Sequence, residues 1–340
     1  MKLFNLKNLF VCLAVTAAAG LSSCDSVVYD DEQDCTIDVK FRYDMNLKYA
    51  DAFAHEVHSV HLFVLDKAGN LIYEKSEKGD ALAQEGYHIN IDLDEGEYRF
   101  LAWCGMDNDT DKESFKFHDA TEGELLRSVR LQHGEESGMA VSKDDLYGLY
   151  HGAIDVEIPH NRSARMSVTI PLTKDTNHLR VIMQHLRGED TDVNDFAFRV
   201  VEDNGHLRAD NMPVEYRPIE YRPWGLTNGV AGVDNDKSRT VEDVQCAIAD
   251  LTFSRLMADS DQILEITTEN GTKTVARIPL IDYFLMVQSN FLKTMPEQEF
   301  LDRQDEYSLT IFLDSDDKWV STYINILSWR VVVNNTDIDY

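Results

Sequence analysis

TIDVKFRY, residues 36–43, is the stretch that decides the fold, because its apolar residues alternate with polar ones. Alternation with a period of two predicts a β-strand that buries one face and exposes the other. Residues 60–64 repeat the pattern and lead into Asp66-Lys67-Ala68-Gly69-Asn70, a sequence typical of a tight turn. The first part of the chain therefore predicts β-strands closed by short turns.

The same alternation continues along the rest of the chain. Before residue 174 we expect a hairpin of strands 87–93 and 97–103 closed by residues 94–96, strands 153–158 and 166–172, and a short helix-like stretch at 142–149. Beyond it we expect strands at 178–185, 196–202, 250–256, 263–268, 273–278, 308–313, 319–326 and 329–333. Short strands with turn sequences between them, and no alternating helices, predict an all-β fold of antiparallel sandwiches.

Two features interrupt this pattern in the second half. Residues 281–292 have apolar side chains at helical spacing and predict the one long helix. Residues 203–247 are rich in Asn, Asp and Gly, so we expect a long irregular insertion there. We place the domain boundary near Lys174, with one sandwich over residues 35–173 and a second over 174–340.

The composition excludes several classes of protein. The chain has 340 residues, 43% of them hydrophobic, which is enough for two domains that each bury a core. Sixty-one acidic against 32 basic side chains give a formal net charge of −29, which repels phosphate backbones. We therefore expect a folded acidic protein with no nucleic acid among its partners.

The amino terminus has the features of a lipoprotein signal peptide, residues 1–23. A short basic start precedes an apolar run of residues 9–21, which is too short to span a bilayer. The run ends in Leu21-Ser22-Ser23-Cys24, which resembles a bacterial lipobox with cleavage between Ser23 and Cys24. Because of this lipobox, we expect Cys24 to be acylated. Two or more acyl chains give stable anchoring, so the protein would be tethered to the membrane and would not span it. The alternative is an ordinary signal peptide that happens to end before a cysteine.

An acidic tether, residues 24–34, follows the expected lipid. Asp25 and the run Asp30-Asp31-Glu32 lie just after the cysteine and resemble the surface-export signal of Bacteroidota lipoproteins. The alternative is a merely solvated linker. The charge would also hold the body away from an anionic membrane surface.

Five cysteines leave three for the folded body after Cys12 and Cys24 are set aside. Cys35 and Cys104 lie at the ends of predicted strands in the same half, so they are a candidate disulfide in an oxidising envelope. Three reduced thiols, with Cys246 as the third, are the alternative. No Cys or His spacing supports a zinc site.

Motifs for catalysis, metals or cofactors are weak in this sequence. The chain has no G-x-S-x-G, P-loop, G-x-G-x-x-G or H-E-x-x-H motif. Residues 107–111 open like a calcium loop, but Lys112 replaces the required glycine and His118 the bidentate glutamate. We therefore expect no enzyme, no resident metal and no cofactor.

Two aromatic residues in the expected insertion are candidate ligand contacts. Tyr221 and Trp224 lie among prolines and could contact a sugar or a partner if both were exposed in one plane. The alternative is that they cover the edge of their own sandwich. Exposure would favour a glycan-binding surface lipoprotein.

Several sequence motifs, in order along the chain, carry a family resemblance. They are Leu62-Phe63-Val64-Leu65-Asp66 with Gly69, Gly96-Glu97-Tyr98 with Ala102-Trp103, Thr176-Asn177-His178-Leu179-Arg180-Val181, the run from Glu299 to Tyr307, and the closing run from Ile324 to Val333. Together they resemble the Bacteroidales fimbrial anchor subunits of type V fimbriae over residues 24–338. Each motif alone is common, but their order after a lipobox is fairly specific.

The resemblance implies two consecutive transthyretin-like β-sandwiches in a surface-exposed lipoprotein of the outer membrane. Such a protein would cap the membrane-proximal end of a fimbrium and bind pilin subunits, which join one another by strand exchange. Its partners would be fimbrial pilins and, through acylated Cys24, outer-membrane lipid. A tip or accessory fimbrial subunit is the alternative within the same superfamily.

The two ends of the mature chain favour the anchor over a stalk subunit. Stalk pilins of the resembled kind are matured by cleavage after an arginine beyond their first strand. Residues 24–41 contain no arginine, and Arg42 lies inside the predicted strand. We therefore expect the first strand to stay in place. The polar end, residues 334–340, is too short for a long donor strand.

Overall fold

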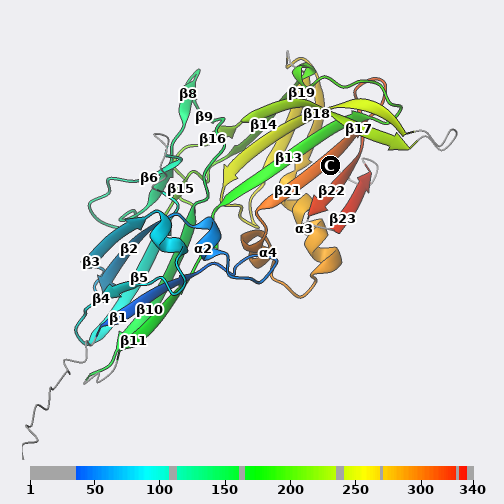
Figure 1. The fold of residues 1–340 in the computed structure, drawn as a ribbon. Coiled ribbons are helices and arrows are strands. Elements are labelled where there is room, and N and C mark those ends of the chain that lie inside the picture. Colours follow the sequence, from blue (N-terminus) through cyan, green and yellow to red (C-terminus); the bar gives the residue numbers. More distant parts are fainter. Residues whose placement is uncertain are drawn as a thin grey trace, which may run out of the picture.

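The computed structural model describes residues 36–106, 113–160, 165–234, 241–268, 271–326 and 329–334. The described chain consists mostly of β-strands arranged in two halves along one long axis (Figure 1). The predicted all-β class is confirmed. Most strand pairs are antiparallel, but β1–β11, β13–β21 and β9–β16 are parallel.

The first half has two sheets that enclose a core. The smaller sheet has the order β11 (Met166–Pro171), β1 (Ile37–Arg42), β4 (Ile89–Ile91). The larger has the order β12 (Thr173–Lys174), β10 (Tyr150–Ile158), β5 (Gly96–Cys104), β2 (Ser59–Asp66), β3 (Leu71–Lys78). Ile37 and Val39 face Leu62 and Phe100 in one buried cluster, as the alternation in residues 36–43 predicts.

The predicted hairpin at residues 87–103 is wrong. β4 pairs with β1 through Ile37↔Ile91, whereas β5 pairs with β2 and β10 in the other sheet. The turn at residues 94–96 therefore passes the chain from one sheet to the other. The physical reason is length, because the nine residues of β5 are matched along all nine positions by β10, and β4 has only three.

The second half has two sheets of six strands. One has the order β17 (Gly225–Asp234), β18 (Val241–Ser254), β13 (Thr176–His185), β21 (Glu306–Leu313), β22 (Trp319–Ile326), β23 (Trp329–Asn334). The other has the order β20 (Thr274–Pro279), β19 (Ile263–Thr268), β14 (Phe196–Glu202), β16 (Ile219–Tyr221), β9 (Met139–Ser142), β8 (Gly134–Glu136). β14, β19 and β22 have the bounds predicted from the sequence.

Two sequence predictions about irregular segments are wrong. Residues 203–247, predicted as an irregular insertion, supply β15 (His206–Leu207), β16, β17 and the first part of β18. Residues 142–149, predicted as helix-like, follow β9 without any helix. In residues 203–247 the pairing with neighbouring strands decides the structure, because local Gly, Asn and Asp content gives no information about distant partners.

The sheets also cross the expected boundary near Lys174. β9 pairs in parallel with β16, so a segment that precedes residue 174 completes a sheet of the second half. β6 (Phe115–Phe117) and β7 (Val129–Leu131) form a further small sheet with β15. We keep Lys174 as the proposed domain boundary along the sequence, although residues 134–142 belong to a sheet of the second half.

The helices within the described ranges are few. They are α2 (Phe53–Glu56), α3 (Leu280–Phe291) and α4 (Glu297–Arg303), with 3-10 turns η1 (Asp80–Ala83) and η2 (Val193–Asp195). The helix predicted at residues 281–292 is confirmed as α3, which buries Phe284 in a stack against Tyr307 at 3.7 Å between ring centroids. In the described part of the chain, no helix has the length and apolar character needed to cross a membrane.

Candidate functional site

Several predicted site residues lie outside the described part of the chain. Ser23, Cys24, Cys35 and the loop at 107–111 are all among them. Cleavage and lipidation at residues 23 and 24 therefore remain predictions. Cys104 lies on β5 and is fully buried, and burial raises the pKa of its thiol. Its pairing with Cys35 also stays a prediction.

The structure separates the two aromatic residues that were predicted as ligand contacts. Tyr221 is completely buried on β16, donates a hydrogen bond to Asn204 Oδ1 at 2.6 Å and packs edge-on against Phe253. The prediction is wrong for Tyr221, because a core side chain cannot contact a ligand. Trp224 precedes β17 and is 42% exposed, so it alone remains available.

The first strand fills the middle of the small sheet in the first half. β1 pairs with β11 over six residues, from Ile37↔Met166 to Arg42↔Pro171, and with β4 over three. Ile37 and Val39 have no exposed surface. The position between β4 and β11 is thus occupied by the chain's own strand, and both of its edges are paired.

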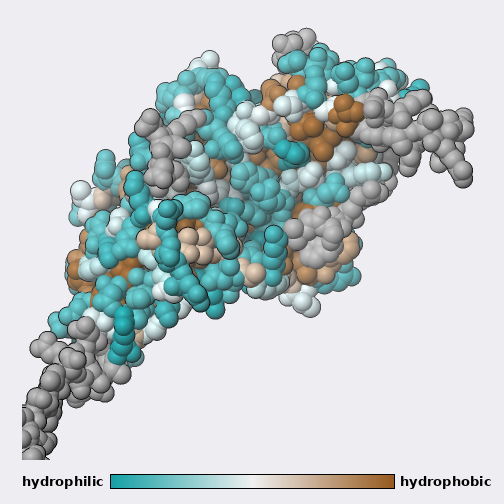
Figure 2. Space-filling view, viewed as in Figure 1, coloured by the Kyte–Doolittle hydropathy of each residue, from teal (hydrophilic) through white to brown (hydrophobic). Residues whose placement is uncertain are grey.

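The opposite half ends in a long edge strand that exposes apolar side chains. β17 pairs with β18 over ten residues and has no other partner among the described strands. Leu226 is 48% exposed and Val230 is 68% exposed. Figure 2 shows apolar side chains gathered over the region of β17 and β18. An apolar edge strand is a ready template for pairing with another chain.

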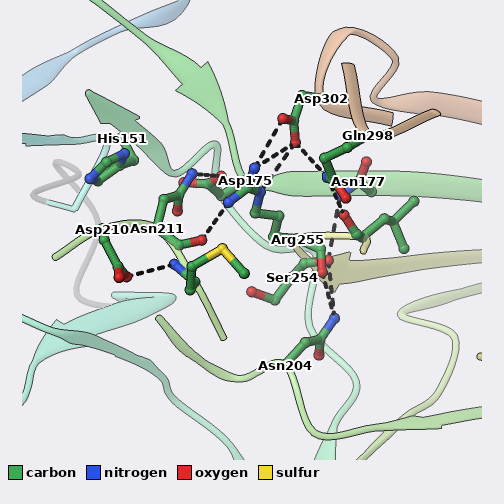
Figure 3. Close-up of polar contacts among 12 residues, drawn as sticks. His151, Asp175, Asn177, Asn204, Asp210, Asn211, Ser254, Arg255, Gln298 and Asp302 are labelled. Carbon is green, nitrogen blue, oxygen red and sulfur yellow. Dashed lines mark hydrogen bonds and ion pairs between the residues drawn. The ribbon is translucent and has the colours of Figure 1, made fainter. Parts of the chain in front are cut away.

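A buried polar cluster lies between the two halves (Figure 3). Asp175, in the link between β12 and β13, has no exposed surface and accepts a hydrogen bond from Asn211 at 2.9 Å. Arg255 lies 3.7 Å from Asp175 and makes two 2.9 Å hydrogen bonds to the carboxylate of Asp302 on α4. Burial raises the pKa of Asp175 to about 7, because a charged carboxyl is costly to remove from water.

Largely buried charged side chains join the halves around this cluster. Lys174 lies 2.5 Å from Asp305 beside β21 and 3.5 Å from Glu56 of α2. Arg303 donates to the carbonyl oxygen of Asp44 at 3.1 Å. The same arginine's carbonyl oxygen accepts a hydrogen bond from the backbone N–H of Leu47, also at 3.1 Å. These contacts tie the segment after β1 to α4.

An apolar cluster also runs through the junction. Phe63, Leu101 and Trp103 of the five-stranded sheet belong to the same buried cluster as the core of the second half. Trp103 donates its indole N–H to the carbonyl oxygen of Arg127 at 3.0 Å, which fixes the segment that precedes β7. The junction therefore combines apolar packing with paired charges.

Sequence reasoning missed the residues of this junction. Asp175, Asn211, Arg255 and Asp302 are far apart in the chain, and no motif links them. Only the topology brings them together. Within the described ranges, no group of three or more His, Cys, Asp or Glu side chains is arranged to hold a metal ion.

The chain is similar to proteins of known family and structure. Residues 31–335 match the family model of fimbrillin-A associated anchor proteins Mfa1 and Mfa2. A crystal structure from Bacteroides thetaiotaomicron, described as a candidate adhesin, is 32% identical and has a TM-score of 0.76 over 89% of this chain and 100% of that chain. A second from the same organism, described as a candidate polysaccharide-binding protein, is 29% identical with a TM-score of 0.73 over 90% and 100%.

A more distant neighbour agrees in fold. The fimbrial anchor protein Mfa2 from Porphyromonas gingivalis is 16% identical and has a TM-score of 0.63 over 88% of this chain and 99% of that chain. No curated protein sequence matches the chain. The chain is a fimbrium-associated protein of the cell surface and belongs to the family of fimbrillin-A associated anchor proteins.

Proposed function

We propose that this protein anchors a fimbrium to the outer membrane and ends its assembly at the membrane-proximal end. Acylated Cys24 is the membrane attachment, and residues 24–34 are the tether. Fimbrial pilins are the protein partners, held by strand pairing at an open sheet edge. Family membership supports the fimbrial association. The pairing of β1 and the single partner of β17 support the terminating position and the docking edge, and the lipobox in the sequence supports the lipid attachment.

The observation that carries the proposal is the position of β1. A subunit that receives a neighbour's strand needs a vacant strand position, and the position between β4 and β11 is already filled. Ile37 and Val39 bury their side chains completely there, so release of β1 would expose apolar surface to water. The first half therefore cannot accept a further subunit without losing its own strand, which suits a terminating position.

The layout of the molecule agrees with an anchor. β1 begins at the end of the first half that points away from the second half, whereas β17 lies at the opposite end of the long axis (Figure 1). The tether precedes β1 in the sequence. A pilin bound at β17 would then lie on the side of the molecule remote from the lipid.

We assign the docking edge to β17. Its ten residues, its single strand partner and the exposed side chains of Leu226 and Val230 give an incoming strand both main-chain groups and apolar contacts. Natural edges that must stay unpaired are usually protected by charge. On β17, two of the most exposed positions are apolar.

The test is a charge placed on that edge. Val230→Lys should reduce capture of fimbrial subunits from the native host's outer-membrane extract by at least about tenfold, because a strand pairing there must bury the ammonium group. Ile72→Lys is the matched control, since Ile72 is 44% exposed on β3, the edge strand of the first half's sheet. Equal capture by wild type and Val230→Lys would refute docking at β17.

A further inference from the structure

A hollow of about 520 Å³ lies on the outer face of the six-stranded sheet that contains β13. Its lining includes His178, Arg180 and Ile182 of β13 at every second position, so these side chains share one face. Trp224 borders it at the start of β17. The volume lies within the range of small-ligand sites in proteins.

Polar side chains form a row across four strands in this hollow. Arg180 is opposite Asp250 of β18 on one side and Ser308 of β21 on the other, and Ser308 is opposite Asn325 of β22. Arg180 makes two hydrogen bonds to Asp250, of 2.7 and 3.2 Å, which fix the orientation of both groups. The small Ser308 leaves the hollow open between Arg180 and Asn325.

Two members of the row keep free hydrogen-bonding capacity. Neither Ser308 nor Asn325 makes a side-chain hydrogen bond to another residue in the described part of the chain. An amide and a hydroxyl of this kind each offer a donor and an acceptor to a ligand. Backbone groups in the middle of the sheet are paired with neighbouring strands, so a ligand here is held by side chains and not by strand addition.

Trp224 supplies the apolar side of the hollow. Its side chain is 42% exposed, whereas Trp103 and Trp319 are buried. Indole combines a large flat apolar surface with a polar N–H. Such a surface packs against the C–H face of a pyranose ring while the ring's hydroxyl groups reach neighbouring polar side chains.

The charges select among possible sugars. The guanidinium of Arg180 is already neutralised by Asp250, and Glu306 adds a carboxyl to the lining. The chain carries a formal net charge of −29. Acidic glycans would be repelled, so the ligand chemistry that fits is a neutral hexose or pentose unit.

We propose that this hollow is a binding site for one unit of a neutral glycan, with Trp224 as the stacking surface and Arg180, Asp250, Ser308 and Asn325 as hydrogen-bonding groups. The site goes beyond the proposed anchoring function and does not depend on it. It would give this fimbrium-associated protein a contact with neutral polysaccharide at the cell surface.

The test is calorimetric titration of the full mature chain, carrying Cys24→Ala for solubility, with maltoheptaose, mannohexaose, xylohexaose and galactotetraose. We expect saturable binding of at least one sugar. Trp224→Ala should weaken that binding about tenfold, which corresponds to about 1.4 kcal/mol for the lost aromatic contact, and Trp224→Phe should retain most of it.

Asn325→Ala should also weaken binding of the same sugar, and Phe291→Ala is the matched control. Phe291 is 46% exposed at the end of α3, outside the hollow, so its loss should leave the affinity unchanged. Thermal unfolding of each variant checks that the fold is retained. No binding of any of the four sugars, or equal affinity of wild type and Trp224→Ala, would overturn the proposal. Neither result bears on pilin capture.

Discussion

At the scale of single residues, the polar cluster between the halves is the least expected feature. A carboxyl with no exposed surface is rare. Asp175 accepts a hydrogen bond from Asn211 and lies next to the guanidinium of Arg255. One of its oxygen atoms, Oδ2, has no hydrogen-bond partner among the described residues. The burial of this group therefore makes stability depend on pH.

Asp175→Asn should remove that dependence. Because burial raises the pKa of Asp175 from 3.8 to about 7, the folded state binds more protons than the unfolded state between these values. The contribution of Asp175 to the free energy of unfolding is therefore fully present near pH 4 and is lost as the pH rises to about 7. A shift of this size corresponds to about 4 kcal/mol. Urea unfolding at pH 4, 6 and 8 should show the variant gaining stability relative to wild type as the pH rises.

Asp66→Asn is the control for the sign of this effect. The side chain and backbone N–H of Asn70 lower the pKa of Asp66, so its contribution is lost only as the pH falls below about 4. That variant should differ from wild type by nearly the same amount at pH 4, 6 and 8. A flat difference for Asp175→Asn as well would contradict the assignment of a raised pKa to Asp175.

At the scale of elements, the small sheet of the first half depends on the register of β1. Val39 has no exposed surface, and the next residue, Lys40, points to solvent. A shift by one residue would exchange these two faces. The strand is therefore fixed both by its pairing with β4 and β11 and by the core behind it.

Val39→Asp should unfold the first half or destabilise it by several kcal/mol, because a charge would be buried without a partner. Lys40→Asp, one position along the same strand, should cost less than about 1 kcal/mol because the side chain stays in water. Urea unfolding followed by circular dichroism measures both. A similar loss for the two variants would mean that β1 does not have the register described.

The elements also show what the sequence can and cannot predict. The sequence predicts the bounds of β14, β19 and β22 correctly because turn sequences flank these strands and apolar residues recur along them. β17 was missed because its glycines and asparagine resemble a loop, and only its ten-residue pairing with β18 makes it a strand. For the same reason, Trp224 could be named from the sequence, but the row that includes Arg180 and Asn325 could not.

At the scale of the whole molecule, hydrogen bonds and ion pairs at the junction connect the two halves. Lys174 lies between Asp305 and Glu56, and although burial lowers its pKa, these acids hold the pKa above its usual value. Arg303 holds the segment after β1 through the carbonyl oxygen of Asp44. In the proposed anchoring role, tension between the tether before β1 and a pilin at β17 would pass through this junction.

The double variant Lys174→Met and Arg303→Ala should uncouple the halves. We expect wild type to unfold in a single calorimetric transition and the double variant in two, with the lower one shifted down by several degrees. Arg277→Ala is the control, since Arg277 pairs with Glu265 inside one sheet. A single unshifted transition in the double variant would show that apolar packing alone couples the halves.

The most direct test of the anchoring function is cell fractionation of the native host expressing Cys24→Ala in place of wild type. If acylated Cys24 holds the fimbrium, fimbrial subunits should move from the cell-bound fraction into the medium, together with the unlipidated protein. The amount of each subunit made should stay the same. Fimbriae that remain on the cells at wild-type levels, with the Cys24→Ala protein present and folded, would contradict the account.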